Sequence, residues 1–143
     1  MAITAERTFE TVAPVVRLQG QLTTNATYYK GQLVVWNAGR FANPTNAANL
    51  VPAGVLTGFG FDPTAGGTQV VPDGPTPDAE VIRGKVWVPF TGAAQTDVGL
   101  IFYLADNGDV TKTAGNKTWG VLCVGFKSGY VLLDFDNLQG AAS

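Results

Sequence analysis

The sequence predicts an all-β protein, and two observations carry that prediction. Stretches with apolar residues at the i, i+3, i+4 and i+7 spacing of an amphipathic helix are nearly absent. What recurs instead is short apolar runs rich in Val, Ile, Phe, Tyr and Trp, each bounded by Gly, Pro, Asn or Asp. That is the pattern of strands separated by turns. We therefore expect a compact antiparallel β-barrel or sandwich with an extended N-terminal arm and little or no helix.

Nine strands follow from this pattern, taken in order along the chain. They are expected at residues 12–18, 33–36, 53–61, 68–71, 81–90, 100–104, 110–112, 118–126 and 130–135. Only residues 43–50 (NPTNAANL) offer a helical turn, and Gly39 and Pro44 flank or break it. The segment VPDGPTPDAE carries closely spaced prolines from Pro72 to Pro77, so it is expected to be an ordered surface loop or an edge excursion.

Two turns have a chemical basis. Lys127-Ser128-Gly129 lies between two apolar runs and predicts a tight hairpin in which glycine supplies the positive φ. The second turn is LADNGDVT (residues 104–111), whose oxygen-bearing side chains and glycine raise the alternative of a calcium loop.

The surroundings of LADNGDVT favour a hairpin. A calcium loop of the EF-hand kind needs a bidentate Glu further along, whereas VTKT follows here. Asn107-Gly108 between two strand-like flanks is the strongest short-range hairpin signal, so we expect a two-residue hairpin loop. Calcium or EDTA is then expected to leave the melting temperature unchanged.

An internal repeat is visible in two glycine-led units. Gly31 opens GQLVVW and Gly54 opens GVLTGF, while Gly99 opens GLIFYL and Gly120 opens GVLCVGF. Each unit contains a glycine, an apolar strand, a polar loop, then Gly-Val-Leu and another strand, and RGKVWVPF links the two. Two related hairpin units around a linking strand predict a barrel or sandwich with pseudo-symmetry.

The composition excludes most catalytic chemistry. The 143-residue chain is 45% apolar and 14% charged, and it contains no histidine. The missing histidine removes the commonest general base and the commonest metal ligand, so we expect no catalytic residue, no metal site and no cofactor. The one cysteine, Cys123, lies in the apolar run VLCVGF and is expected to be a buried small hydrophobe.

The charge distribution limits the partners. The formal net charge is -2 and no basic stripe exists, so nucleic-acid binding is not expected. No apolar run approaches the ~20 residues of a membrane helix, and MAITAERTFETVAPVV lacks the pattern of a signal peptide. Thr, Asn, Gln, Gly and aromatic residues must cover the surface, which favours contact with a protein partner.

Two further sets of side chains have competing interpretations. Asp134 and Asp136 flank Phe135, so on a strand the two carboxylates share one face, as at a solvated strand end rather than in a catalytic dyad. Trp36, Trp87 and Trp119 fall within expected strands. They serve either core or interface packing, which we favour, or a sugar-binding platform.

The N-terminal segment differs from the rest of the chain in its residue pattern. Residues 1–20 are polar and then extended, and Pro14 lacks the N–H that a central strand needs. Two uses remain open, an arm that adds a strand to another subunit and a local edge strand. The expected organisation is therefore an arm or edge strand over residues 1–20 and a single β domain over residues 21–143.

The succession GQLVVW, PAGVLTGF, VIRGKVWVPFTG and DVGLIFYLADNGDVTKTAGNKTWGVLCVGFKSG resembles the small capsid decoration, or cement, proteins of tailed bacteriophages. The order and spacing of these motifs, over about residues 28–134, carry the resemblance. It implies a β-barrel-like or β-tulip protein that forms homotrimers on the outer surface of the capsid and bridges neighbouring major-capsid subunits. It also implies capsid contact by residues 1–20, where the expected contact residues are Thr8, Phe9, Val12, Pro14, Val15 and Arg17.

Three classes of function follow. The first is a structural virion protein that decorates and stabilises a phage capsid. The second is a β-sandwich binding module, such as a fibre-tip or carbohydrate-binding domain, that uses surface aromatic residues. The third, an enzyme with carboxylates alone, ranks last because the Asp and Glu residues are scattered over turns. The first class is expected, because an adhesive surface of low charge without histidine suits a cement protein.

Overall fold

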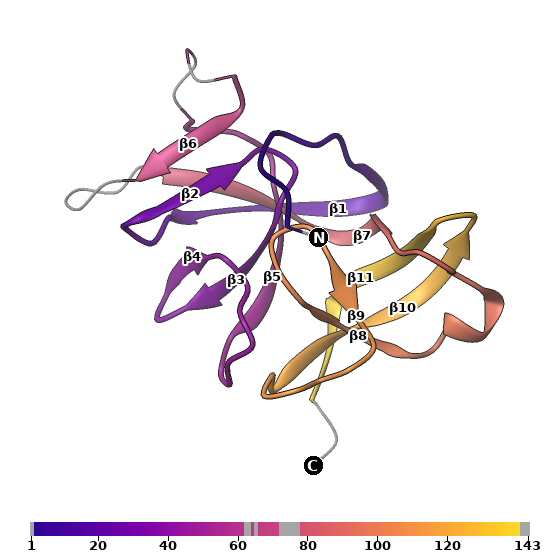
Figure 1. The fold of residues 1–143 in the computed structure, drawn as a ribbon. Coiled ribbons are helices and arrows are strands. Elements are labelled where there is room, and N and C mark those ends of the chain that lie inside the picture. Colours follow the sequence, from indigo (N-terminus) through magenta and orange to yellow (C-terminus); the bar gives the residue numbers. More distant parts are fainter. Residues whose placement is uncertain (1, 62–63, 65, 72–77, 141–143) are drawn as a thin grey trace.

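The computed structural model describes residues 2–61, 64, 66–71 and 78–140. In these residues the chain forms eleven strands and one short 3₁₀ helix, η1 (Gln95–Asp97) (Figure 1). The strands are β1 (Glu10–Gln21), β2 (Ala26–Tyr29), β3 (Leu33–Asn37), β4 (Arg40–Ala42), β5 (Val51–Leu56), β6 (Thr68–Val71), β7 (Asp78–Pro89), β8 (Ile101–Leu104), β9 (Val110–Thr111), β10 (Trp119–Lys127) and β11 (Tyr130–Gly140). No helix in the described ranges is long and apolar enough to span a membrane.

The all-β prediction is confirmed, and each of the nine expected strands is present. β6 has the expected bounds, whereas β1 and β11 are longer than expected. β5 ends at Leu56 rather than at residue 61, because Gly58 and Gly60 adopt positive φ angles of 89° and 83° and turn the chain away. Lys127 pairs with Tyr130, which confirms the tight hairpin between β10 and β11.

Some elements differ from the prediction. β2, β4 and η1 were not expected, and residues 43–50 contain a turn but no helix. β3 and β4 are joined by Ala38 and Gly39, which both have positive φ, as in a type I′ turn. Alanine rarely adopts that conformation, so the sequence gives no hairpin signal there. The proline-rich loop at residues 72–77 lies outside the described residues.

β7 joins the two halves of the sheet. β1 runs antiparallel along one edge of β7 for most of its length. On the other edge, β7 pairs with β5 at Val81 and Ile82 and then with β11 from Lys85 onward. The strand order is β4-β3-β5-β7-β11-β10-β8-β9, with β1 added beside β7. The change of partner falls at Gly84, where an added Cβ would lie 2.9 Å from the carbonyl oxygen of Pro14.

The sheet buries two cores on opposite faces of β3 and β5. In β3, Leu33 and Val35 point into the first core and Val34 points into the second, as the alternation of a strand requires. The strands β8–β11 curl round to complete the first core, and β1, β2 and β6 complete the second. Because both faces of β3 and β5 are buried, their sequences are continuous apolar runs.

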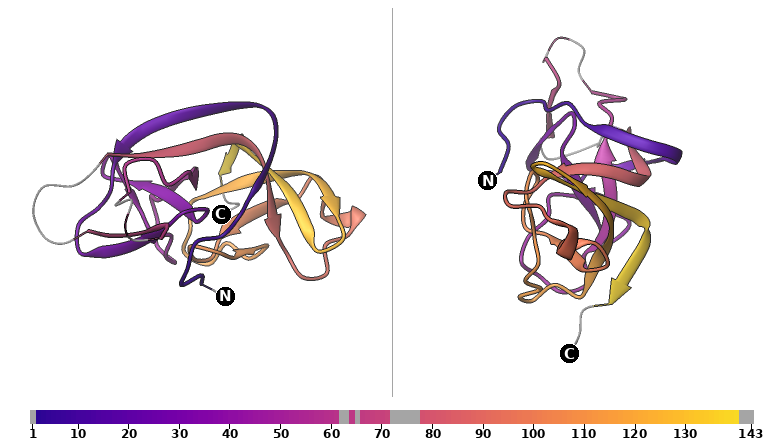
Figure 2. Two further views of the ribbon diagram at one scale, coloured as in Figure 1. Left: turned by 90° about the horizontal axis from the view of Figure 1, so that it is seen from above. Right: turned by 90° about the vertical axis from the view of Figure 1, so that its right-hand side faces the viewer.

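Each core is closed by a contact outside the main ladder. Leu22 forms a bridge with Phe41, which brings the end of β1 against β4 around the second core. At the first core, the amide of Leu33 donates to the carbonyl of Asn107 (2.8 Å) and ties the β8–β9 loop to β3. Figure 2 shows the N-terminal and C-terminal halves side by side, with residues 2–9, the strap, leading into β1.

The strand pairing supports the internal repeat. β3 pairs with β4 and β5, and β8 pairs in the same way with β9 and β10. Gly31 and Gly99 have similar positive φ angles of 86° and 91° shortly before the central strand of each unit begins. The chain therefore contains two three-strand units of the same connectivity.

Candidate interaction surface

The strap is held on the domain at two points. Ile3 is paired with the side chain of Asn107: its amide donates to Oδ1 (2.8 Å) and its carbonyl accepts from Nδ2 (3.1 Å). Further along, the amide of Arg7 donates to the carbonyl of Lys30 (2.8 Å), and Nη1 of Arg7 donates to the carbonyl of Gly108 (2.8 Å). The β8–β9 loop and the segment before β3 thus form the docking site of the strap.

The β8–β9 connection is a hairpin, as predicted, but its loop has five residues (105–109) rather than two. Oδ1 of Asp106 accepts hydrogen bonds from the amides of Gly108 (2.8 Å) and Asp109 (2.7 Å), which shapes the loop. Asn107 is consequently turned inward and is only 9% exposed. Within the described ranges, no group of three or more His, Cys, Asp or Glu side chains is arranged to hold a metal ion.

The six predicted contact residues lie on the strap and on β1, but they differ in accessibility. The exposed ones are Thr8, Pro14 and Arg17, and the half-buried ones are Phe9, Val12 and Val15. Phe9 packs against the first core. Pro14 lies where the register between β1 and β7 shifts, and β1 forms a sheet edge, which is one of the two alternatives for this segment.

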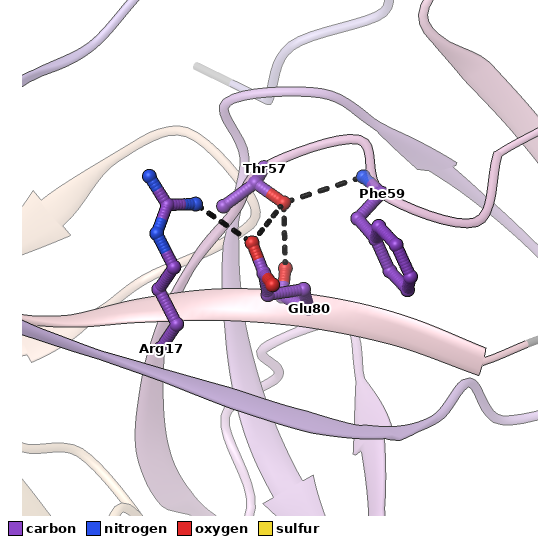
Figure 3. A network of polar contacts seen from close by, with 4 residues as sticks. All are labelled: Arg17, Thr57, Phe59 and Glu80. Atoms are coloured by element: carbon purple, nitrogen blue, oxygen red, sulfur yellow. Dashed lines mark hydrogen bonds and ion pairs between the residues drawn. The ribbon is translucent and has the colours of Figure 1, made fainter.

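Arg17 belongs to a polar network that connects β1, β7 and the turn after β5 (Figure 3). Its Nη1 donates to Oε1 of Glu80 (2.8 Å), which also accepts from Oγ1 of Thr57 (3.1 Å). The amide of Phe59 donates to the same hydroxyl (3.3 Å), and the Phe59 side chain stays 52% exposed. Because Arg17 is largely exposed, the ion pair contributes at most about 1 kcal/mol. The network fixes the turn that presents Phe59 to solvent.

A cleft of about 520 Å³ opens between the strap and the end of β7. Its floor consists of first-core residues and backbone around them, and its rim is polar and aromatic. The lining includes Leu33, Val55, Val86 and Val88 at the floor, with Arg7, Glu10, Trp87, Lys127 and Tyr130 around them. Ligand sites in proteins typically measure roughly 300–1,000 Å³, so this cleft has the size of a binding site.

Lys127 is held at the rim of this cleft by three neighbours. Its Nζ lies 2.7 Å from Oε1 of Glu10, and it sits over the rings of Trp87 (4.5 Å) and Tyr130 (5.2 Å). Cation–π contacts of this kind and the ion pair fix the ammonium group between β1, β7 and the β10–β11 hairpin.

The three tryptophans occupy separate places. Trp36 packs against Phe41 with ring centroids 4.2 Å apart, beside the second core. Trp87 lies under Lys127 at the cleft, and Trp119 is 39% exposed at the start of β10. The contacts of Trp36 and Trp87 match the packing interpretation, whereas for the exposed Trp119 that interpretation stays a prediction.

Asp97 is the buried carboxylate of the C-terminal half. It accepts from Nζ of Lys112 (3.0 Å) and from the amide of Ala94 (3.0 Å). These bonds, the one from Lys112 above all, lower the pKa of Asp97 below its ordinary value. The ion pair anchors η1, since Asp97 is the last residue of that helix.

The other residues with reactive or charged side chains, Cys123, Asp134 and Asp136, have surroundings that indicate a structural role. Cys123 is buried, as predicted, and burial raises the pKa of its thiol, which keeps it protonated. Phe135 is buried in the first core while Asp134 and Asp136 point the other way, as expected for alternation along a strand. Asp136 forms an ion pair with Arg83 at 3.5 Å.

Sequence reasoning missed the anchors of the strap. Ile3 and Asn107 are 104 positions apart, and Glu10 and Lys127 are 117 apart. No local sequence pattern connects residues at such separations. In the sequence, Asn107 indicates only a turn. The inward orientation of its side chain follows from the five-residue loop.

Comparisons with known proteins reveal a structural likeness. No family model matches the chain, and no curated protein matches it in sequence. A chain in the solved structure of the capsid of Myoviridae phage XM1 has a similar fold, with a TM-score of 0.54 and 16% sequence identity. The superposition covers 88% of this chain and 87% of that chain, so the likeness extends over most of both chains. At this identity it shows the fold alone.

Proposed function

We propose that this chain is a structural, non-enzymatic virion protein that decorates the outer surface of a phage capsid and bridges neighbouring major-capsid subunits. The observation that carries the proposal is the fold shared, over 88% of the chain, with a chain of a phage capsid. The motif order that resembles capsid decoration proteins supports the same class independently.

The surface chemistry supports this function. Only 14% of the residues are charged, whereas a typical soluble domain has roughly 25%. Several large apolar side chains are exposed in the described ranges: Val16, Phe59, Val70, Leu100, Trp119, Phe126 and Tyr130. Protein interfaces are poor in charge and rich in aromatic residues at their centres. Many copies on one capsid add modest contacts into a strong attachment.

The capsid contact in this proposal is made by the N-terminal segment, residues 1–20. Thr8, Pro14 and Arg17 are the exposed ones among its six predicted contact residues. The outer edge of β1 offers main-chain groups for a partner strand. Three copies around a three-fold position of the capsid, as the resemblance implies, would each contribute one such edge.

Co-sedimentation with heads of the phage that encodes the chain tests this function. We expect the protein to bind expanded heads and to bind neither procapsids nor free major-capsid protein. Light scattering is expected to give the mass of a trimer. Arg17→Glu is expected to weaken head binding, whereas Arg40→Glu, a matched change in the exposed part of β4, is expected to leave it unchanged. A monomer that binds no form of the head would refute the proposal.

A further inference from the structure

We infer that the cleft between the strap and β7 binds an organic carboxylate with an apolar body. In this site Arg7 holds the carboxylate, and the partly exposed rings of Phe9, Trp87 and Tyr130 take the apolar part. The inference concerns the cleft of this chain and does not rest on the proposed function.

Arg7 has unused hydrogen-bonding capacity at this cleft. The residue is half-buried, and burial lowers the pKa of its guanidinium. Nη1 donates to the carbonyl of Gly108, and no carboxylate of the described residues lies within ion-pair distance of Arg7. Asp106 and Tyr130 are close enough to act on its charge without pairing with it. A guanidinium has several N–H donors in a planar fork, which matches a carboxylate.

The second cation at the cleft, Lys127, already has an anionic partner within the chain. Lys127 is paired with Glu10 at 2.7 Å and lies over two aromatic rings. The lining therefore contains one cation, Arg7, without a carboxylate partner. An anion that enters the cleft is therefore attracted most strongly to its strap side, where Arg7 lies.

The accessible apolar part of the lining selects the rest of the ligand. Leu33, Val55, Val86 and Val88 are already buried behind the cleft, whereas Phe9 and Trp87 are half-buried and Tyr130 is 40% exposed. Covering these rings with an apolar group releases water from apolar surface, at about 25 cal/mol per Å². A single guanidinium beside such rings suits a singly charged carboxylate better than a phosphate, which usually has several cationic partners. The carboxylate can belong to a free organic acid or to a Glu side chain between apolar residues.

Two-dimensional NMR with labelled protein tests the site. The probes are octanoate and octanol, and the peptides acetyl-Leu-Glu-Leu-amide and acetyl-Leu-Gln-Leu-amide. We expect octanoate to shift the Nε1–H signal of Trp87 and the Nε–H signal of Arg7 in a saturable way. Octanol is expected to bind roughly tenfold more weakly, the factor for one charged hydrogen bond. Saturation by the Glu peptide but not the Gln peptide identifies a protein side chain as a ligand; saturation by octanoate alone identifies a free acid.

Three variants complete the test. Arg7→Gln is expected to weaken octanoate binding roughly tenfold, and Arg17→Gln, outside the cleft, is expected to leave it unchanged. Thr8→Trp places a large ring at an exposed residue of the lining and is expected to block the cleft with Arg7 intact. Melting curves verify that each variant is folded. Equal binding of octanoate and octanol, or no saturable shift with either carboxylate in the folded native protein, would overturn the inference.

Discussion

At the scale of single residues, the carboxamide of Asn107 pairs with both main-chain groups of Ile3, as a neighbouring strand would. Asn107→Ala removes both hydrogen bonds, and the freed groups of Ile3 are accessible to water. We expect the free energy of unfolding to fall by about 1 kcal/mol, measured by urea denaturation. Hydrogen exchange of the Ile3 amide is expected to accelerate. Asn37→Ala, at the exposed end of β3, serves as the control, and unchanged exchange at Ile3 in Asn107→Ala would contradict the pairing.

Asp97 is expected to make the free energy of unfolding fall as the pH becomes acidic. Its pKa is lowered in the folded protein, chiefly by the hydrogen bond from Lys112. The resulting stabilisation is complete above the unfolded-state pKa and is lost as the pH falls through the folded-state pKa. Asp97→Asn is therefore expected to be less stable than the native chain at neutral pH, with a difference that shrinks below about pH 4.

Urea titrations at a series of pH values measure this difference. Lys112→Met removes the same ion pair from its other side, so its stability deficit is expected to shrink over the same acidic range. A deficit of Asp97→Asn that is constant from neutral to acidic pH would show that the ion pair is not its cause.

At the scale of elements, Gly54 allows β5 to approach β7. Its φ is 141°, and a Cβ at this position would overlap the carbonyl oxygen of Ile82. Gly54→Ala is expected to cost about 3 kcal/mol of unfolding free energy, because the two strands must separate. Gly39→Ala is the matched control, since Gly39 also has a positive φ but has open space around it. It is expected to cost about 1 kcal/mol. Equal losses in urea denaturation would exclude a steric role for Gly54.

The individual strands and hairpins differ in whether the sequence predicts them. Strands such as β6 and the β10–β11 hairpin were predicted because apolar runs and a glycine turn are local signals. The β3–β4 hairpin was missed because Ala38 adopts a positive φ that only its tertiary surroundings impose. The cleft and the strap were missed for a different reason: they are built from residues near both ends of the chain, which only the complete fold brings together.

At the scale of the whole molecule, β3 and β5 contribute to both cores, so neither core can lose its packing alone. We expect a single cooperative unfolding transition. Phe135→Leu, in the first core, is expected to lower stability by about 1 kcal/mol. The same shift should appear in far-UV circular dichroism and in the fluorescence of Trp36, which packs beside the second core.

Trp36 can be observed alone in a Trp87→Phe, Trp119→Phe background. This background without Phe135→Leu provides the reference curve for both probes. Two separate midpoints, with only the circular dichroism midpoint displaced by Phe135→Leu, would mean that the halves unfold independently.

The position of β7 in the chain also determines the order in which the protein acquires structure during synthesis. β1 leaves the ribosome early, but its partner β7 begins only at Asp78. Until then β3 and β5 lack Ala79 and Val81 in the second core and Val86 and Val88 in the first core, and the first core is completed only with Phe135. Non-local pairing of this kind is slow, and exposed apolar strands of a nascent chain invite association. The protein is therefore expected to depend on chaperone protection for most of its translation, although the finished fold leaves those strands inaccessible.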